Sequence, residues 1–164
     1  MDGALPRQSM QIRPATPDDA QGIIAITNAA FAIEPFIEGT RTDAERLAVE
    51  MQTGEFLVAV APDHRVVASV HVELHGERGY FGMLAVDPPE QGRGLGPAMI
   101  RAAEDYCRKH GCKAMDIKVL SLRPELFPYY RRLGYVETAT EEFRPSRPLK
   151  PGVQCHCVVM SKQL

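Results

Sequence analysis

The first third of the chain carries apolar residues at helical spacing. Between Ile23 and Phe31 they recur at intervals close to one turn of an α-helix. Thr16, Pro17 and the two aspartates that follow suit a helix N-terminus, because they cap it and complement its dipole. The pattern predicts a short strand over 10–13, a helix from about 16 to 31, a loop over 32–40 and a second helix over about 42–52.

After Gly54 the chain changes to short apolar runs separated by turn residues. Pro88 and Pro89 end one run, because proline cannot donate a hydrogen bond to a sheet. A further amphipathic stretch ends before Gly111, a residue type suited to a helix C-cap. The predicted strands are 56–60, 66–74, 80–86, 114–120, 135–138 and 153–160, and the predicted helices are 95–110 and 125–133.

The order of the predicted elements is βααβββαβαββ, which indicates an α/β fold with one mixed sheet and helices on both of its faces. At 164 residues the chain fits one domain with a sizeable core. We assign residues 10–164 to this domain and residues 1–9 to a disordered lead-in. A ligand is expected at the central strand-loop-helix, residues 80–110.

Charge and composition exclude several classes of protein. The formal net charge of −2 argues against binding nucleic acid mainly through its phosphates, since proteins that do so are basic. No apolar run approaches the roughly 18 to 20 residues that span a bilayer. The segment from Met1 to Met10 lacks the apolar core of a secretory signal. We therefore predict a cytoplasmic protein without nucleic-acid or membrane partners.

The four cysteines are expected to be small core residues. None of their spacings matches the C-x2-C pattern of zinc sites, and a reducing cytosol disfavours disulfides. Cys155 and Cys157 would share one face of a strand with His156 on the other, so these three make a poor chelate. No metal cofactor is predicted.

The run Gln91-Gly92-Arg93-Gly94-Leu95-Gly96 directly follows a predicted strand and opens a predicted helix. Its glycines allow a sharp turn that brings several backbone N–H groups to one point. The helix N-terminus adds unpaired N–H groups and its dipole, and Arg93 adds a charge, so the loop suits a diphosphate. Pro97 and Ala98 rule out a Walker loop, and Gly96 comes one residue early for the dinucleotide fingerprint. A turn without a ligand is the alternative.

Two separated motifs make the chain similar to a known family. Residues 81–88, Phe-Gly-Met-Leu-Ala-Val-Asp-Pro, followed by Gln91-x-x-Gly94-x-Gly96, resemble motif A of the GNAT (Gcn5-related) N-acetyltransferases. Residues 130–135, Tyr-Arg-Arg-Leu-Gly-Tyr, resemble the family's Tyr-x-x-x-Gly-Phe/Tyr segment. The element order also matches, over nearly the whole chain. The resemblance implies a GNAT-like fold and an enzyme that transfers an acetyl group from acetyl-CoA to an amine.

The resemblance also implies a CoA site and a general acid. In the family the strands at 80–86 and 114–120 diverge, and the pantetheine arm of CoA lies between them. Tyr130 matches the tyrosine that protonates the departing thiolate, with packing against the cofactor as the alternative role. Tyr129 should face another way on the helix, and Arg123 stands where many relatives have an asparagine that contacts CoA. The implied CoA-binding residues are Leu84, Ala85 and Val86 on the strand and Gln91, Gly92, Arg93, Gly94, Leu95 and Gly96 in the loop.

The general base does not carry over from the family. Relatives have a glutamate at the position of Tyr80 or at that of Lys118, and this chain has a carboxylate at neither. Glu73 and His71 would share one face of a neighbouring strand, and Glu34 lies in the first helix–helix loop. These residues and a relay of water molecules are the candidates for the base.

The acceptor is the part of the function that the sequence determines least. The resemblance places it against the first two helices and the last strand pair. Glu34, Phe36, Glu38 and Glu73 are candidates for binding the cationic amine of a small molecule or peptide. The loop over 144–150 carries the opposite charge and is a candidate for contacting the CoA phosphates or an anionic substrate. A catalytically silent acyl-CoA sensor or interaction module is a second hypothesis, which the missing carboxylates favour. A homodimer is left open.

Overall fold

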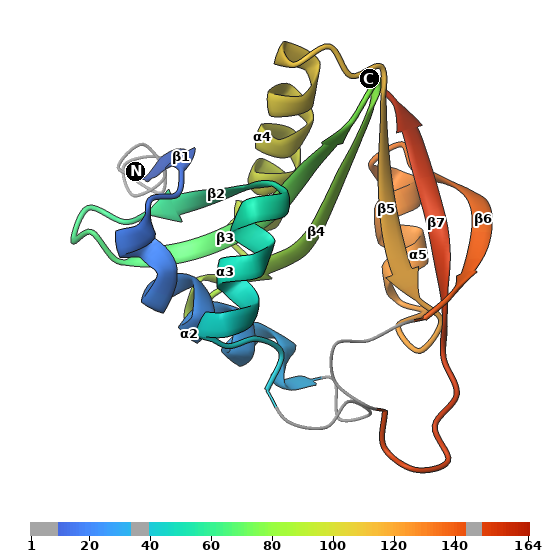
Figure 1. Ribbon diagram of the computed structural model, residues 1–164, viewed down its shortest axis with the longest axis horizontal. Helices are drawn as coiled ribbons and strands as arrows, with labels where there is room; N and C mark the ends of the chain where they lie inside the picture. The colour runs from blue at the N-terminus through green and yellow to red at the C-terminus, as the bar shows by residue number, and fades with distance from the viewer. Residues whose placement is uncertain (1–9, 34–39, 144–148) are drawn as a thin grey trace.

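The computed structural model describes residues 10–33, 40–143 and 149–164, so the predicted lead-in lies outside the described residues. Within these ranges one seven-stranded sheet has the order β1-β2-β3-β4-β5-β7-β6 (Figure 1). The strands are β1 (Gln11–Pro14), β2 (Glu55–Val60), β3 (Val66–His75), β4 (Arg78–Val86), β5 (Ala114–Leu120), β6 (Val136–Glu142) and β7 (His156–Gln163). The helices are α2 (Ala20–Ala30), α3 (Ala44–Thr53), α4 (Leu95–Lys109) and α5 (Leu126–Arg132), with short 3-10 turns η1 (Pro17–Asp19), η2 (Phe31–Ile33) and η3 (Pro88–Glu90).

Two central strands, β4 and β5, run parallel to each other in a sheet whose other neighbours are antiparallel. They pair over a short stretch, where residues 78–80 lie opposite residues 114–116. Beyond Tyr80 they diverge, so the sheet opens into two halves that meet near the C-terminus (Figure 1). The facing edges of β4 and β5 beyond this point have no strand partner among the described residues.

Helices cover both faces of the sheet, which confirms the predicted α/β class and the predicted order of the elements. α2 and α3 pack on one face, where Ile23, Leu47 and Phe56 are buried. α4 and α5 pack on the other face, around Met99 and Tyr135. Because alternate residues of a strand point to opposite faces, a ligand between β4 and β5 would meet side chains from both helix pairs.

Some boundaries differ from the predicted ones. β7 begins at His156 rather than at 153 and reaches Gln163, because its residues pair with β5 on one side and β6 on the other. β6 extends to Glu142 instead of ending at 138, and it is exposed throughout, so no apolar alternation marks its length in the sequence. α3 starts after Asp43, whose carboxylate accepts a hydrogen bond from the Arg46 N–H at 2.9 Å and caps the helix.

A charged clamp holds β4 against β5 at the point from which they diverge. The Arg78 guanidinium donates two hydrogen bonds to the Asp116 carboxylate, at 2.8 and 2.6 Å. The Ser161 hydroxyl on β7 donates a third at 2.6 Å. The hydrogen bonds from Arg78 hold the pKa of Asp116 below its usual range. The clamp therefore joins three strands at the vertex of the divergence.

A buried polar network crosses the core on the α4 side. Glu104 is 3% exposed, and its carboxylate accepts from the Tyr135 hydroxyl at 2.7 Å and from the Lys162 amine at 3.0 Å. These three residues come from α4, from the end of the 130–135 segment and from β7. A buried carboxylate is tolerated only where it is paired in this way, so the network fixes α4 against the second half of the sheet.

We expect Tyr135→Phe to lower the free energy of unfolding by about 1–3 kcal/mol, because it removes one donor from the buried Glu104 carboxylate. The matched control is Tyr106→Phe on α4, whose hydroxyl has no hydrogen bond within the described part of the chain and whose ring is only half-buried. Urea unfolding measures both variants. An equal loss of stability in the two, with unchanged m-values, would contradict a role for the network.

Candidate active site

A cleft of about 1260 Å³ opens where β4 and β5 diverge. Its walls include β4 from Tyr80 to Leu84 and β5 from Ile117 to Leu120. The glycine loop and α5 close it on one side of the sheet, and residues of α2, η2 and α3 reach it on the other. The cleft is therefore lined by residues from both faces of the sheet.

The glycine loop borders the cleft at the start of α4. Gly92 and Gly94 have φ values of 84° and 82°, a left-handed conformation that favours glycine. Gly94 directly precedes α4, so the unpaired N–H groups of the first turn point toward the loop. The Gln91 side chain donates to the Val86 carbonyl at 3.1 Å and ties the loop to the end of β4. The loop thus has the exposed N–H groups and helix dipole that bind a diphosphate.

A β-bulge distorts β4 beside the cleft. Ser69 pairs with Ala85 and His71 with Gly82, so β4 contains one residue more than β3 between these two pairs. Met83 takes up the extra residue with φ 51°, which is strained for a side chain of this size. Such strain is typical of functional sites. The bulge turns the backbone near Leu84 and was not foreseen from the sequence.

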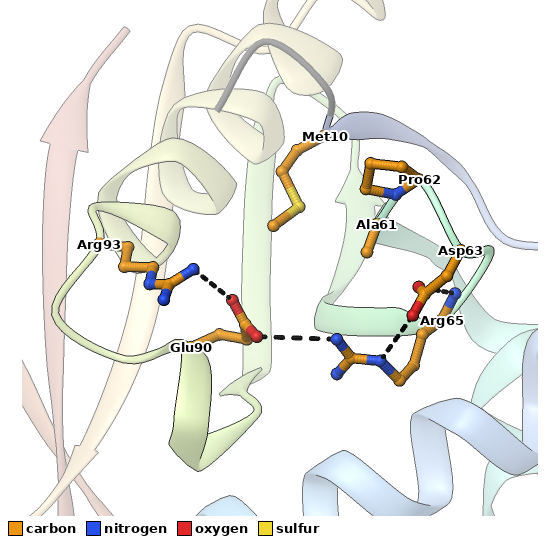
Figure 2. A pocket seen from close by; sticks show the side chains of 7 residues that line it. All are labelled: Met10, Ala61, Pro62, Asp63, Arg65, Glu90 and Arg93. Carbon is orange, nitrogen blue, oxygen red and sulfur yellow. Dashed lines mark hydrogen bonds and ion pairs between the residues drawn. The ribbon is translucent and has the colours of Figure 1, made fainter. Parts of the chain in front are cut away.

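Arg93 lies outside the cleft, in a smaller hollow beside it. Figure 2 shows the Arg93 guanidinium donating to Glu90 at 3.3 Å, while Arg65 approaches the other oxygen of Glu90 at 3.8 Å. Glu90 is 9% exposed, so the two arginines compensate a nearly buried charge. Arg65 also pairs with Asp63 at 3.4 Å (Figure 2), which links the loop to the turn between β2 and β3. The predicted contact of Arg93 with a phosphate stays a prediction.

Tyr130 lines the cleft from the α5 side. It is 9% exposed and contacts the rings of Phe81, Tyr129 and Tyr135 edge-on or tilted. Its hydroxyl has no hydrogen-bond partner among the described residues. Burial raises the pKa of Tyr130, so the hydroxyl keeps its proton at neutral pH. The expectation that Tyr129 faces elsewhere is wrong, since it also lines the cleft, with its hydroxyl 3.5 Å from the Cβ position of Gly96.

Tyr80 and Lys118 form the floor of the cleft on the α2–α3 face. The Lys118 amine lies 5.7 Å from the centre of the Tyr80 ring and pairs with Glu141 on β6 at 3.1 Å. The Tyr80 hydroxyl lies 2.6 Å from the position that a Cβ would take at Gly82, so only glycine there leaves room for the ring. Burial raises the pKa of Tyr80 to about 12. These are the two positions at which the resemblance implied a carboxylate in other members of the family, and this chain has none at either.

Further charged groups line the cleft on this same face. Arg41 stacks its guanidinium over the Phe31 ring at 5.1 Å. Glu50, in the last turns of α3, lines the cleft with one carboxylate oxygen buried and without a hydrogen-bond partner in the described ranges. The sequence alone singled out neither Arg41 nor Glu50, because nothing local distinguishes them from the solvated side chains of a helix and its flanks.

The predicted site residues are only partly brought together. The cleft is lined by Tyr130, Arg123, Leu84, Val86, Gln91, Gly92, Gly94, Leu95 and Gly96, but not by the side chains of Ala85 and Arg93. Glu34, Phe36 and Glu38 lie outside the described residues. Glu73 is outside the cleft lining, where it pairs with His75 at 2.9 Å and lies 3.5 Å from His71.

His71 is poorly placed to act as a base. It is 3% exposed, and its Nε2 donates a hydrogen bond to the Glu50 carbonyl at 2.8 Å, which fixes the tautomer. Burial lowers the pKa of His71. The ring stacks on Phe56 with centroids 4.6 Å apart, so His71 supports the packing of α3 on β3.

The model of the acetyltransferase (GNAT) family matches residues 23–135, which include the glycine loop and the segment that begins at Tyr130. The chain belongs to the GNAT family of acetyltransferases. This confirms the resemblance that the two sequence motifs indicated, and it supports an enzyme that transfers an acyl or acetyl group.

Relatives of known name lie within the same family. The mycothiol acetyltransferase of Pseudarthrobacter chlorophenolicus is 32% identical over 146 residues, which are 82% of this chain and 44% of that protein. Glucosamine 6-phosphate N-acetyltransferase 1 of Oryza sativa subsp. japonica is 28% identical over 142 residues, 79% of this chain and 83% of that protein. The chain spans half or less of the length of the mycothiol acetyltransferases that it matches.

The fold is shared with solved GNAT structures. The structure of yncA from Salmonella typhimurium, determined with its cofactor acetyl-CoA, has a TM-score of 0.72 and 23% identity, covering 95% of this chain and 94% of that one. No helix in the described part of the chain is long and apolar enough to cross a membrane. Among the described residues, no group of three or more His, Cys, Asp or Glu side chains could hold a metal ion.

Proposed function

We propose that this chain transfers an acetyl group from acetyl-CoA to a primary amine of a small molecule or peptide. The observation that carries the proposal is the cleft between β4 and β5, which has the glycine loop and Tyr130 on one face and Glu50, Arg41 and Lys118 on the other. Two substrates can then meet in one cleft from opposite faces of the sheet. This arrangement supports direct attack of the amine on the thioester.

The donor substrate would lie along β4. Its diphosphate would accept hydrogen bonds from the N–H groups of residues 91–96, where Gly92 and Gly94 leave room for close approach. The amides of its pantetheine arm would pair with the backbone of Leu84, Ala85 and Val86, because this edge of β4 lacks a strand partner among the described residues. The free edge and the glycine loop both fit the donor.

The transfer needs one charge to be stabilised and one proton to be supplied. The amine nitrogen attacks the thioester carbon, the C–N bond forms, and negative charge grows on the carbonyl oxygen. A backbone N–H near Leu84 or Ala85 would stabilise that oxygen. The C–S bond then breaks, and the sulfur takes its proton from the Tyr130 hydroxyl, whose raised pKa keeps it protonated until this step.

A covalent acetyl-enzyme is disfavoured by the state of the cysteine in the cleft. Cys157 lines the cleft but is 6% exposed. Burial raises the pKa of its thiol, whereas an attacking cysteine needs a lowered pKa to be present as thiolate. This supports direct transfer over a two-step reaction through Cys157.

The experiment that tests the proposal is a panel of amines with acetyl-CoA, with free thiol release as the readout. The panel spans amino sugars and their phosphates, polyamines, aminoglycosides, amino acids and peptide N-termini, and mass spectrometry identifies the acetylated product. Thiol release that depends on one amine class, with stoichiometric N-acetyl product, supports the proposal. CoA binding by calorimetry without thiol release in any mixture would favour the acyl-CoA sensor instead.

A further inference from the structure

We infer that Glu50 is the general base of this site and the group that binds the ammonium of the acceptor. The inference rests on the proposed function, since it concerns the amine that the acetyl group is transferred to. Glu50 lies on α3 and lines the cleft on the face opposite Tyr130. A base on one face and an acid on the other match a reaction in which the amine and the leaving sulfur lie on opposite sides of the thioester carbon.

The hydrogen-bonding state of Glu50 supports this role. Its Oε1 is buried and has no hydrogen-bond partner in the described part of the chain. A buried carboxylate oxygen is costly to leave unpaired, and such groups are rare in folded proteins. Glu50 itself lines the cleft, so an ammonium there, which has three N–H donors, would approach the carboxylate from the cleft side. Its positive charge would offset the cost of a partly buried carboxylate that has an unpaired oxygen.

The other carboxylates near this face are already paired. Glu141 is paired with Lys118 at 3.1 Å, and Glu73 with His75 at 2.9 Å. Glu73 is also outside the cleft lining. Among the described carboxylates that line the cleft, Glu50 is thus the one whose buried oxygen has no partner.

Burial and the charges around Glu50 determine the pKa of its carboxylate. Burial raises its pKa most, with Glu73 and Asp43 acting in the same direction, while the positive charges of Arg41 and Arg46 oppose the shift. The net pKa is raised above its ordinary value. Of the other titratable groups that face it, His71 on β3 has a lowered pKa and Tyr80 on β4 a raised one, so both stay neutral near pH 7. A carboxylate with a raised pKa is a better base.

The protons in this scheme balance. The acceptor arrives as an ammonium, and the Glu50 carboxylate takes one proton from it, which then passes to water. The free amine forms the C–N bond, and its nitrogen gives a second proton to Glu50 as the C–S bond breaks. Tyr130 gives its proton to the sulfur and is reprotonated from Glu50, so each turnover releases one proton to solvent.

The test is the pH profile of kcat/KM for the best amine in the parent and in Glu50→Gln. The parent should be nearly flat between the pKa of Glu50 and that of the amine, because the reacting pair is carboxylate and ammonium. The variant should be slower by about 10²- to 10⁴-fold at neutral pH. It should then recover about tenfold per pH unit as a lysine-like amine with a pKa of about 10.4 deprotonates.

Two further variants separate a chemical role from a structural one. Glu45→Gln removes the same charge from an exposed position on α3 and should keep the parent profile. Glu50→Asp keeps a carboxylate on a shorter stem, so it should retain a plateau whose acidic edge is shifted. A slower Glu50→Gln with the parent's flat profile, or a Glu50→Asp with an unmoved acidic edge, would overturn the role of Glu50. Either result would leave the proposed acetyl transfer standing. No transfer by the parent to any amine would overturn the proposed function and this inference with it.

Discussion

Replacing Gly94 by glutamate is expected to abolish CoA binding while the protein stays folded. Gly94 has φ 82° and directly precedes α4, where the diphosphate would lie. A side chain there would fill the space needed for close approach of the phosphates, and its carboxylate would occupy the helix N-terminus in their place. We expect CoA affinity to fall by about 100-fold or more, equivalent to about 2.7 kcal/mol or more of binding free energy.

Calorimetry with CoA measures this loss, and Gly76→Glu is the matched control. Gly76 also has positive φ, 64°, and the space around its Cβ position is open, but it lies in the turn between β3 and β4, away from the loop. Both substitutions place a side chain at a residue with positive φ, which costs about 1–2 kcal/mol in backbone strain. Only Gly94→Glu should lose affinity for CoA. A folded Gly94→Glu with the affinity of the parent would remove the glycine loop from the binding site.

The fold could be predicted from the sequence wherever the signal is local. Pro88 follows the end of β4 because proline has a fixed φ and no N–H to donate to a sheet, and Gly111 follows the end of α4 because glycine readily adopts the positive φ, here 87°, that ends a helix. The short pairing of β4 with β5 could not be predicted, because it depends on contacts between residues 36 apart, such as Arg78 and Ala114. β6 was predicted too short, since its exposed, polar residues pair with β7 without any apolar pattern.

The same distinction applies to the candidate site. The glycine loop was predictable, because phosphate-binding geometry is encoded in consecutive residues. The role of Glu50 was not predictable, because a glutamate on an amphipathic helix is normally expected to be solvated. Only the folded structure shows that Glu50 and Arg41 line the same cleft. The buried Glu104 was likewise hidden in a helix of charged residues, although its two partners make it part of the core. The bulge at Met83 has no marker in the sequence, because methionine does not favour positive φ.

Tyr130→Phe should reduce kcat by about 10²- to 10⁴-fold, the usual contribution of general acid–base catalysis. The change removes only the hydroxyl, which has no hydrogen-bond partner among the described residues, so no hydrogen bond of the described part of the chain is lost with it. Burial raises the pKa of Tyr130 above the ordinary value of about 10, and the hydroxyl therefore stays protonated across the working pH range. A protonated donor beside the sulfur stabilises the departing thiolate, and without it the C–S bond breaks more slowly.

The effect on kcat must be separated from an effect on CoA binding. Tyr129→Phe removes the other tyrosine hydroxyl of the cleft, which lies beside Gly96 at the loop end, so its effect should appear in CoA affinity rather than in kcat. For Tyr130→Phe, CoA affinity should stay close to that of the parent. Single-turnover kinetics establish whether the chemical step limits kcat in each protein. If chemistry is limiting and Tyr130→Phe still turns over like the parent, Tyr130 is a packing residue beside Phe81 and Tyr135, and the leaving sulfur takes its proton from solvent.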